Sequence, residues 1–400
     1  MKTLLLSWRY LWSRPLGAAL NLLLLSLGLG SISFLLLVGA QLDKAFDRDL
    51  AGIDAVVGAK GSPLQLILSG VLHIDQPTGN IPLKAAEALK AHPMVASVIP
   101  ISLGDSLRGF RIVGTSKDYL AHYQATLAQG QPWAAPMQAV VGATAARQLG
   151  LVLGSRFAGS HGLGGGGHAH GDTPYTVTGI LQPSGSVLDR LILTDTASVW
   201  QVHEDATALD DEDRAALQAE REITLALIRY KTPLAALSFP RFVNSSTEMQ
   251  AAAPALEISR LLKMLGLGID VLRAFAGVLL LTAGLSVFIA LWSAVRERRA
   301  DLALLRLLGA PPRRVATLLL CEALWLGLLA SLIGVGLGQG FAAALGWLLQ
   351  MDNAVIVGAM VWPASLWLLP SVALGVSCAA ALLPALSAYR IPVLMLLQNR

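Results

Sequence analysis

Charged residues are scarce in this chain. Only 14% of its 400 residues are Asp, Glu, Lys or Arg, whereas soluble domains contain roughly 25%. The scarcity is concentrated in four windows, each of which supplies the ~20 apolar residues that a helix needs to cross a bilayer. They are residues 16–40, 271–295, 315–349 and 364–388. The sequence therefore predicts a protein with four membrane spans in a one-plus-three arrangement.

The first window is too long for the apolar core of a secretory signal. No clear cleavage site follows it, because Val38-Gly39-Ala40 runs directly into Gln41, Leu42 and Asp43. We therefore expect a retained membrane anchor.

Arginine sets the predicted orientation of the spans. The loop at residues 296–314 carries six arginines and two acids, and basic residues also occur in the N-terminal segment (1–15) and the C-terminal tail (389–400). Basic segments next to spans stay on the cytoplasmic side. We expect both termini and this loop to face the cytoplasm, with residues 41–270 and the short loop 350–363 outside. The net charge of +4 is then a consequence of membrane orientation, and a nucleic-acid partner is not expected.

The positions of the cysteines and histidines limit where disulfide or metal chemistry can occur. The two cysteines, Cys321 and Cys378, both lie in predicted spans, so the exterior segment has neither a disulfide framework nor a thiolate metal site. All seven histidines lie between residues 73 and 203. Any metal chemistry is therefore expected in the exterior segment.

The exterior segment has a mixed pattern. Short runs rich in Val, Ile, Leu and Thr predict strands, and amphipathic stretches predict helices, which together indicate an α+β domain. Helical stalks at residues 41–50 and 248–266 are expected to join it to the membrane. The predicted strands are 53–58, 95–101, 110–114, 175–181, 190–193 and 223–230, and the predicted helices are 83–91, 143–149 and 206–219.

The basic loop contains apolar residues at helical spacing. Its leucines predict a short amphipathic helix over residues 296–309, ended by Gly309 and followed by Pro311-Pro312. Charge alone would indicate only an anchor to anionic lipid. The sharp end of the helix favours a docking element.

The basic loop and the C-terminal part of the chain resemble a known family of membrane proteins. The segment RERRADLALLRLLGAPPRR, which begins at Arg296, resembles the R-x-x-E/R-x-x-x-L-x-x-L-R-x-L-G-A signature of FtsX-like, MacB/LolE-type ABC transporter permeases. Glu322 matches the acid that follows in the next span, and PALSAYRIPVLMLL at residues 384–397 resembles the ending of the family. The exterior segments 56–68 and 181–195 are similar to those of a bacterial subgroup of these permeases.

The resemblance implies a MacB-like periplasmic domain over residues 41–270 and an FtsX-like permease domain over 271–395, in the inner membrane of a bacterial cell. It also implies a homodimer whose protomers each bind a separate ATPase subunit, which supplies ATP hydrolysis and pushes the 296–309 helix so that the stalks move the exterior domain. The chain itself has no G-x4-G-K-[S/T] motif, so we expect no ATPase activity from it. The residues implied for coupling are Arg296, Arg298, Arg299, Leu302, Leu305, Arg306, Gly309 and Glu322.

Glu322 is the acid placed well inside a span. A carboxylate at the centre of a bilayer costs at least ~2.5 kcal/mol. A proton relay is one role for such a group. We favour pairing with Arg298 or Arg299, which would hold the coupling helix in place.

A glycine-rich loop at residues 161–172 carries three histidines. His161, His168, His170 and Asp172 offer imidazole and carboxylate ligands suited to zinc. The loop predicts a metal site, with His203 as a further candidate ligand, although a flexible hairpin tip with inactive histidines would have the same composition. His73, His92 and His122 are interpreted as ordinary surface or capping histidines.

Two other functions fit the same architecture. One is an efflux or lipoprotein-extraction permease in which the histidine loop is incidental. The other is a regulatory scaffold that binds a periplasmic partner protein and activates a cell-wall hydrolase.

Overall fold

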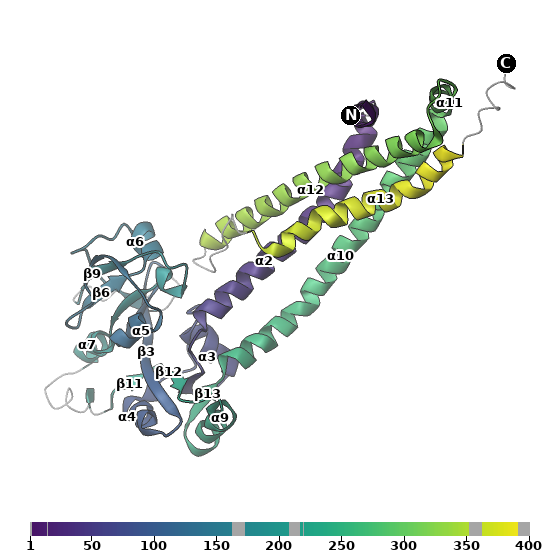
Figure 1. Cartoon of the computed structure of the whole chain (residues 1–400). Coiled ribbons are helices and arrows are strands. Elements are labelled where there is room, and N and C mark those ends of the chain that lie inside the picture. The colour runs from purple at the N-terminus through teal and green to yellow at the C-terminus, as the bar shows by residue number, and fades with distance from the viewer. Residues whose placement is uncertain are drawn as a thin grey trace. The chain divides into compact units, whose positions relative to one another are not determined.

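The computed structural model describes residues 2–13, 15–161, 173–207, 217–218, 220–351 and 362–390. The chain divides into two units, and Figure 1 shows the elements of each. The membrane-helix unit contains the described residues up to Asp43 and those from Leu265 onward. The α+β unit contains Lys44–Met264. Each unit is described below by itself.

Four helices are long and apolar enough to cross a membrane in the part of the chain that the structure describes. They are α2 (Pro15–Asp49), α10 (Pro254–Glu297), α12 (Pro312–Met351) and α13 (Leu368–Tyr389). The four expected spans are therefore confirmed. The second span and its stalk form one continuous helix. This helix begins at Pro254, later than the expected stalk, because residues 249–252 form a strand. Short helices α1 (Lys2–Leu11), α11 (Arg299–Leu307) and η3 (Ala364–Trp367) complete the unit.

Helix α12 packs closely on α2 through two glycines. A Cβ added to Gly334 would lie 2.7 Å from the Cβ of Leu29 and 3.2 Å from the backbone nitrogen of Gly30. Gly338 meets Ser33 and Phe34 in the same way. Gly336 and Gly340 have nothing within 4 Å. The glycine repeat is thus used for helix packing within one chain, as small residues commonly are in membranes.

The α+β unit is built on one large mixed sheet. Its strand order is β13-β1-β12-β3-β4-β10-β6-β9-β5, with β7 beside β9 and β8 beside β3. Most neighbours are antiparallel, whereas β10–β4 and β6–β9 are parallel pairs. A separate two-stranded sheet joins β11 to β2. The expectation of an α+β domain between the first and second spans is confirmed.

The bounds of the remaining elements are as follows. The strands are β1 (Ala55–Ala59), β2 (Ile81–Pro82), β3 (Val95–Leu107), β4 (Phe110–Thr115), β5 (Leu127–Gly130), β6 (Gln138–Val141), β7 (Arg156–Phe157), β8 (Ser160–His161), β9 (Tyr175–Leu181), β10 (Ile192–Asp195), β11 (Glu222–Ile223), β12 (Leu225–Tyr230) and β13 (Met249–Ala252). The helices are α3 (Pro63–Gly70), α4 (Leu83–Ala88), η1 (Leu89–Ala91), α5 (Lys117–His122), α6 (Ala143–Leu149), η2 (Val187–Arg190), α7 (Thr196–Thr207) and α9 (Ala235–Ser246).

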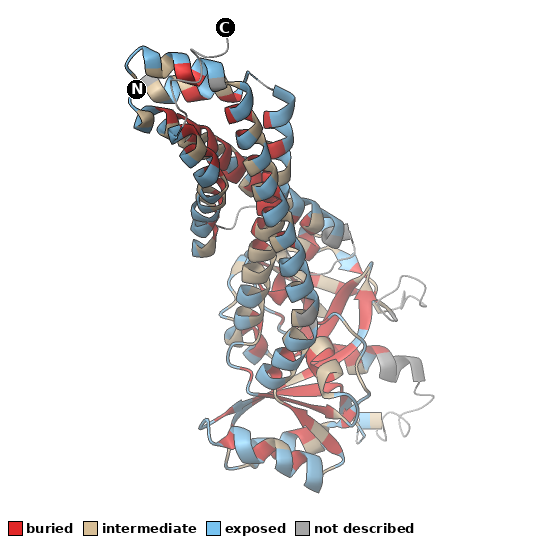
Figure 2. Cartoon of the chain, turned by 90° about the vertical axis from the view of Figure 1, so that its right-hand side faces the viewer, coloured by how far each residue is buried: buried red, intermediate tan, exposed pale blue. Residues whose placement is uncertain are grey.

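Alternation along the strands divides the core into two faces. In β1, Val56 packs with α3 and α5 on one face, whereas Ala55 and Val57 pack with α4 and α9 on the other. Successive side chains of a strand point to opposite faces, so a sheet covered on both sides needs apolar residues at every position. Figure 2 shows the result, with buried strands beneath helices whose outer faces are exposed.

One expected element requires correction, and another lies mostly outside the described residues. Of the helix predicted over 206–219, residues 206–207 form the end of α7 and residues 217–218 are helical, whereas 208–216 and 219 lie outside the described part of the chain. The coupling helix begins at Arg299 rather than Arg296, because α10 continues to Glu297 and the helical geometry breaks at Arg298 (φ −93°, ψ 16°).

The glycine packing can be tested by substitution. Gly334→Leu should destabilise the membrane-helix unit by about 1–3 kcal/mol, because the new side chain overlaps the backbone of α2. The measurement is Tm of the full-length chain in detergent. Gly336→Leu, on the open side of the same helix, is the matched control and should leave Tm unchanged. Equal Tm values for the two variants would contradict the packing.

Candidate functional site

Arg298 joins three parts of the membrane-helix unit at the break between α10 and α11. Its Nη1 donates to Glu322 Oε1 on α12 at 3.2 Å. Its Nη2 donates to Ser13 Oγ at 2.6 Å and to the carbonyl of Tyr10 at 3.0 Å. The guanidinium also lies 4.6 Å from the centroid of the Tyr10 ring. One side chain therefore connects the α10–α11 junction to α12 and to the N-terminal helix α1.

Glu322 has little access to solvent in this arrangement. Its side chain is 4% exposed and that of Arg298 is 14% exposed. A carboxylate in such surroundings needs a charged partner, since an unpaired buried charge costs several kcal/mol. The pairing of Glu322 with an arginine, expected from sequence, is present with Arg298.

Helix α11 has an inward apolar face and an outward face on which three leucines and Asp301 are exposed. Leu302 is buried and Leu305 is half-buried against a core that includes Val315 and Leu319 of α12. The outward face is formed by leucines at i, i+3 and i+4, which are Leu304 (54% exposed), Leu307 (52%) and Leu308 (84%). Of the residues predicted for coupling, Leu302 and Leu305 hold α11 against α12, whereas the exposed leucines of α11 are ones that the sequence did not assign to coupling.

The other predicted coupling residues have different surroundings. Arg296 is exposed at the end of α10, and Arg306 is half-buried and engaged by neighbours. The side chain of Arg299 lies outside the described residues. Gly309 ends α11 as expected, because its φ of +91° is left-handed and its backbone nitrogen donates to the carbonyl of Arg306.

The N-terminal helix is fixed to α12 by aromatic residues. Trp8 and Trp325 make an edge-to-face contact with ring centroids 5.1 Å apart, and Trp325 Nε1 donates to the carbonyl of Leu4 at 3.4 Å. Sequence reasoning assigned no structural role to α1. Its contacts with Arg298 and Trp325 make it a supporting element of the α11 region.

In the α+β unit, both stalk helices end in the same core. Phe46 and Leu50 at the end of α2, and Ile258 and Leu261 near the start of α10, pack in one cluster with Ile101 of β3. Hydrogen bonds fix the end of α2 further. Its last residue, Asp49, accepts from the hydroxyl of Tyr123 through its carbonyl at 2.9 Å and from the backbone of Val187 through its carboxylate at 3.3 Å.

The loop that accepts this contact is ordered by its own side chains. Asp189 accepts from the backbone nitrogens of Ser184 at 2.9 Å and Gly185 at 2.7 Å. Ser186 caps the short helix η2 by accepting from Leu188. These hydrogen bonds order the turn, whose residue Val187 contacts the end of the α2 stalk.

The histidines are distributed unevenly. His161 belongs to β8, whereas His168, His170 and Asp172 lie outside the described residues, as do the side chains of His161 and His203. Among the described residues, no group of three or more His, Cys, Asp or Glu side chains is placed to hold a metal ion. The metal prediction made from sequence therefore stays a prediction.

His73 is not a surface residue, contrary to expectation. It is buried, and its Nε2 shares a hydrogen bond of 3.0 Å with the hydroxyl of Tyr119. Burial, together with the positive charges of Arg111 and Arg190, holds the pKa of His73 well below its ordinary value, so the ring is neutral at pH 7. His92 does act as a cap, because its Nδ1 accepts from the backbone of Met94 at 3.3 Å.

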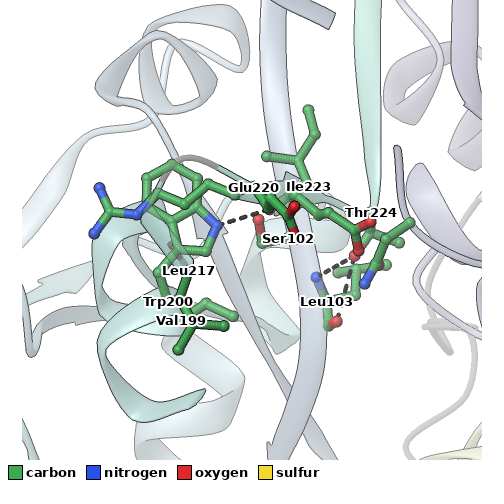
Figure 3. Close-up of a pocket in the computed structure, with 11 residues that line it drawn as sticks. Ser102, Leu103, Val199, Trp200, Leu217, Glu220, Ile223 and Thr224 are labelled. Carbon is green, nitrogen blue, oxygen red and sulfur yellow. Dashed lines mark hydrogen bonds between the residues drawn. The ribbon is translucent and has the colours of Figure 1, made fainter. Parts of the chain in front are cut away.

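A cavity of about 360 Å³ is lined by residues of β3, α7 and β11 (Figure 3). Trp200 forms one wall and donates through Nε1 to the carbonyl of Glu222 at 2.7 Å. The hydroxyl of Thr224 accepts a hydrogen bond from the backbone nitrogen of Leu103 at 2.9 Å, in the place that a backbone carbonyl of a neighbouring strand would take. The hydroxyl of Ser102 is buried with no hydrogen-bond partner among the described residues. The lining residues come from segments around positions 80, 102, 200 and 222, which no local sequence pattern brings together.

These elements define a multi-pass membrane protein with one α+β domain inserted between its first and second spans. Residues 273–393 match the family model of the FtsX-like permease C-terminal domain, and residues 18–229 match that of the MacB-like periplasmic core domain. The chain belongs to the FtsX/MacB-like family of ABC transporter permeases, in which ATPase activity lies in a separate subunit.

Two solved structures are similar to part of the chain. The periplasmic region of MacB from Actinobacillus actinomycetemcomitans is 13% identical, and the alignment covers 54% of this chain and 96% of that one with a TM-score of 0.35. The extracellular domain of the noncanonic ABC-type transporter YknZ from Gram-positive bacteria is 10% identical, with 50% and 99% covered and a TM-score of 0.31. No curated protein matches the chain.

The Arg298–Glu322 pair predicts a strong asymmetry between single and double substitutions. Arg298→Met should destabilise the chain by about 3–5 kcal/mol, because it leaves the Glu322 carboxylate buried without its partner. Adding Glu322→Leu should restore most of this loss. Thermal unfolding of the full-length chain in detergent measures both effects.

Arg313→Met is the control, since Arg313 is exposed on α12, and it should change stability by no more than ~0.5 kcal/mol. If the changes in unfolding free energy caused by the Arg298 and Glu322 substitutions were simply additive, the two side chains would not depend on each other as this pairing requires.

Proposed function

We propose that this permease is a mechanical transmitter in the bacterial inner membrane. An ATPase subunit on the cytoplasmic side binds the outward leucines of α11, and its closure on ATP moves the α10–α11 junction. The stalk parts of α2 and α10 carry this movement to the α+β domain in the periplasm. Both termini face the cytoplasm, and two copies of the chain work as a homodimer.

The observation that carries the proposal is the pair of faces on α11. Leu302 is buried in the bundle core, while Leu304, Leu307 and Leu308 are exposed. Asp301 is also exposed on this nine-residue helix (Arg299–Leu307), but three neighbouring exposed leucines form an apolar patch of the kind that a binding partner covers. Arg298 ties this helix to its neighbours, so a displacement of α11 is passed to the bundle.

The second support comes from the continuity of the stalks. Helices α2 and α10 each run unbroken from the membrane-helix unit into the α+β unit, over 35 and 44 residues. Their ends in the α+β unit are packed in one core rather than attached by loops. Because packed cores resist small deformations, a force on either helix would move the β-sheet as a body.

Substitution of the outward leucines tests the docking surface. The double variant Leu304→Ser, Leu307→Ser should lower the ATP hydrolysis of the complex purified with the full-length chain by at least about tenfold. Burial of one leucine contributes about 1.5–3 kcal/mol, and 1.4 kcal/mol corresponds to a factor of ten in binding.

Leu237→Ser is the control, because Leu237 is even more exposed (78%) but lies on α9 in the α+β unit. It should leave hydrolysis unchanged. Full hydrolysis by the double variant, or equal losses in both, would exclude α11 as the docking element.

We also propose that the work of the domain is linked to zinc. Three of the seven histidines lie within the ten residues 161–170, followed by Asp172. Neutral imidazole and carboxylate are ordinary zinc ligands, and the intervening glycines allow the loop to fold around one ion. Because these glycines also raise the entropy lost on ordering, the expected affinity is moderate, which suits sensing or transfer of the metal.

Zinc binding can be measured on the intact protein. The full-length chain in detergent should bind one zinc ion, as determined by competition with a chromogenic chelator. The triple variant His161→Ala, His168→Ala, His170→Ala should lose this binding, whereas His92→Ala should retain it. Absence of zinc binding by the unmodified chain would remove the metal from the proposal and leave an efflux, extraction or hydrolase-activating role for the same mechanical device.

A further inference from the structure

Helix α1 and the residue that follows it expose large apolar side chains along one side. Leu4 is 49% exposed, Leu5 62%, Trp8 37% and Trp12 43%. Trp12 continues the helical pattern, because its backbone nitrogen donates to the carbonyl of Trp8 at 3.3 Å. At 3.6 residues per turn, the four positions fall within roughly 100° of the helix circumference. They form one apolar surface, which we call the α1 outer face.

The neighbouring side of α1 is packed against the rest of the membrane-helix unit. Leu11 is buried in a core that includes Leu319 and Ala323 of α12. The edge-to-face contact of Trp8 with Trp325 lies beside this core. Because these contacts fix the rotation of α1 about its own axis, the outer face cannot turn inward. It is a constant part of the surface of the unit, and a contiguous apolar surface of this kind marks a site of interaction.

The outer face is continuous along the chain with the surface of the first membrane span. Helix α2 begins at Pro15, directly after this segment, and its first leucines are exposed, with Leu16 at 87% and Leu20 at 56%. Leucines on the outside of a spanning helix contact acyl chains, which are as apolar as leucine itself. Tryptophan is enriched where a span meets the headgroups. The two tryptophans of the outer face are therefore placed as expected for the edge of a bilayer.

The charge of this region indicates which kind of bilayer surface it fits. The first 42 residues contain Lys2, Arg9 and Arg14 and no acidic residue. Arg9 is exposed and lies four residues after Leu5, at the edge of the outer face. Helices with Trp and Leu on one side and basic residues beside them lie in the plane of the membrane interface. Anionic headgroups attract such basic residues, so the charge favours an anionic leaflet as the partner.

The same helix supplies acceptors to the α10–α11 junction. Arg298 Nη2 donates to the carbonyl of Tyr10 at 3.0 Å and to Ser13 Oγ at 2.6 Å, while Nη1 donates to Glu322. The guanidinium that pairs with Glu322 is thus oriented by α1 and the turn after it. A partner that fixes α1 would also fix these two acceptors.

We propose that α1 is an interfacial helix that binds the headgroup region of an anionic leaflet, and that this binding keeps Arg298 in place at the α10–α11 junction. A ligand shifts an equilibrium toward the arrangement that it binds more tightly. A leaflet rich in anionic lipid therefore favours the docked α1 and an ordered α11, and a neutral leaflet favours them less. The proposal involves neither the ATPase subunit nor zinc, so the chain alone can test it.

The position of the outer face is measured on the full-length chain in lipid nanodiscs. A spin label is attached to Leu5→Cys in a background of Cys321→Ala and Cys378→Ala. Its accessibility to oxygen, which concentrates among acyl chains, is compared with its accessibility to a water-soluble nickel chelate. Labels at Leu16→Cys and Leu237→Cys are the lipid and water references. The label at position 5 should resemble the lipid reference.

Two results would overturn the interfacial position. Access of the nickel chelate equal to that at Leu237→Cys would place the outer face in water. Protection from both oxygen and the chelate would show that protein, such as a second copy of the chain, covers it.

The link to the junction is measured with a label at Leu308→Cys on α11. Replacing part of the phosphatidylcholine by phosphatidylglycerol should reduce the mobility of this label. Arg9→Gln should lose most of the response, because each basic residue near an anionic surface contributes about fivefold to binding. Arg241→Gln, which changes an exposed arginine on α9, is the matched control and should retain it. Tm in phosphatidylcholine checks that each variant is folded.

A label on α11 that does not respond to phosphatidylglycerol would overturn the link to the junction, even with Leu5 in lipid. An equal loss of response in the Arg9 and Arg241 variants would exclude α1 as the element that recognises the anionic leaflet.

Discussion

The structure of the membrane-helix unit depends on one buried charge, the carboxylate of Glu322. An acid placed on α12 among apolar helices is tolerated only if a cation lies within reach. Arg298 meets this need from the break between α10 and α11, and its remaining donors bind the carbonyl of Tyr10 and the hydroxyl of Ser13. The cost of leaving Glu322 unpaired therefore determines where α11 begins and keeps α1 beside it.

The Arg298–Glu322 pair helps to explain how the short helix α11 is held in a fixed position. Helix α11 has few residues of its own, and helices shorter than about 12 residues are marginal without tertiary contacts. Leu302 and Leu305 pack it onto α12, and Arg298 secures its first turn. With one face committed to the bundle, the leucines of the other face are held at a constant position, which is what a rigid docking surface requires.

The sequence predicted features that follow from composition and local pattern. The spans, the glycine stop of α11 and the α6 and β9 boundaries are such features, because apolar length, left-handed backbone and strand alternation are local properties. The pairing of Glu322 was predictable because its energetic need is large. The sequence narrowed the partner of Glu322 only to Arg298 or Arg299. Both were expected on one continuous helix, and nothing in their spacing indicated the break at Arg298.

Features that depend on tertiary contact were not predictable. Five of the seven residues at 302–308 are leucines, so the pattern could not tell which of them face the bundle, and the exposed set was missed. His73 was assigned to the surface because its burial depends on Tyr119, 46 residues away.

Strand β3 connects the two stalks within the α+β unit. Its residues Ile99, Ile101 and Leu103 belong to the core that holds the ends of both stalks. Beyond this core, the register of β3 against β4 shifts between Leu103 and Ser106, so that Gly104 and Asp105 stand opposite one residue of β4. Because the ladder is interrupted there, the strand can adjust locally without disturbing the packing of the stalk ends.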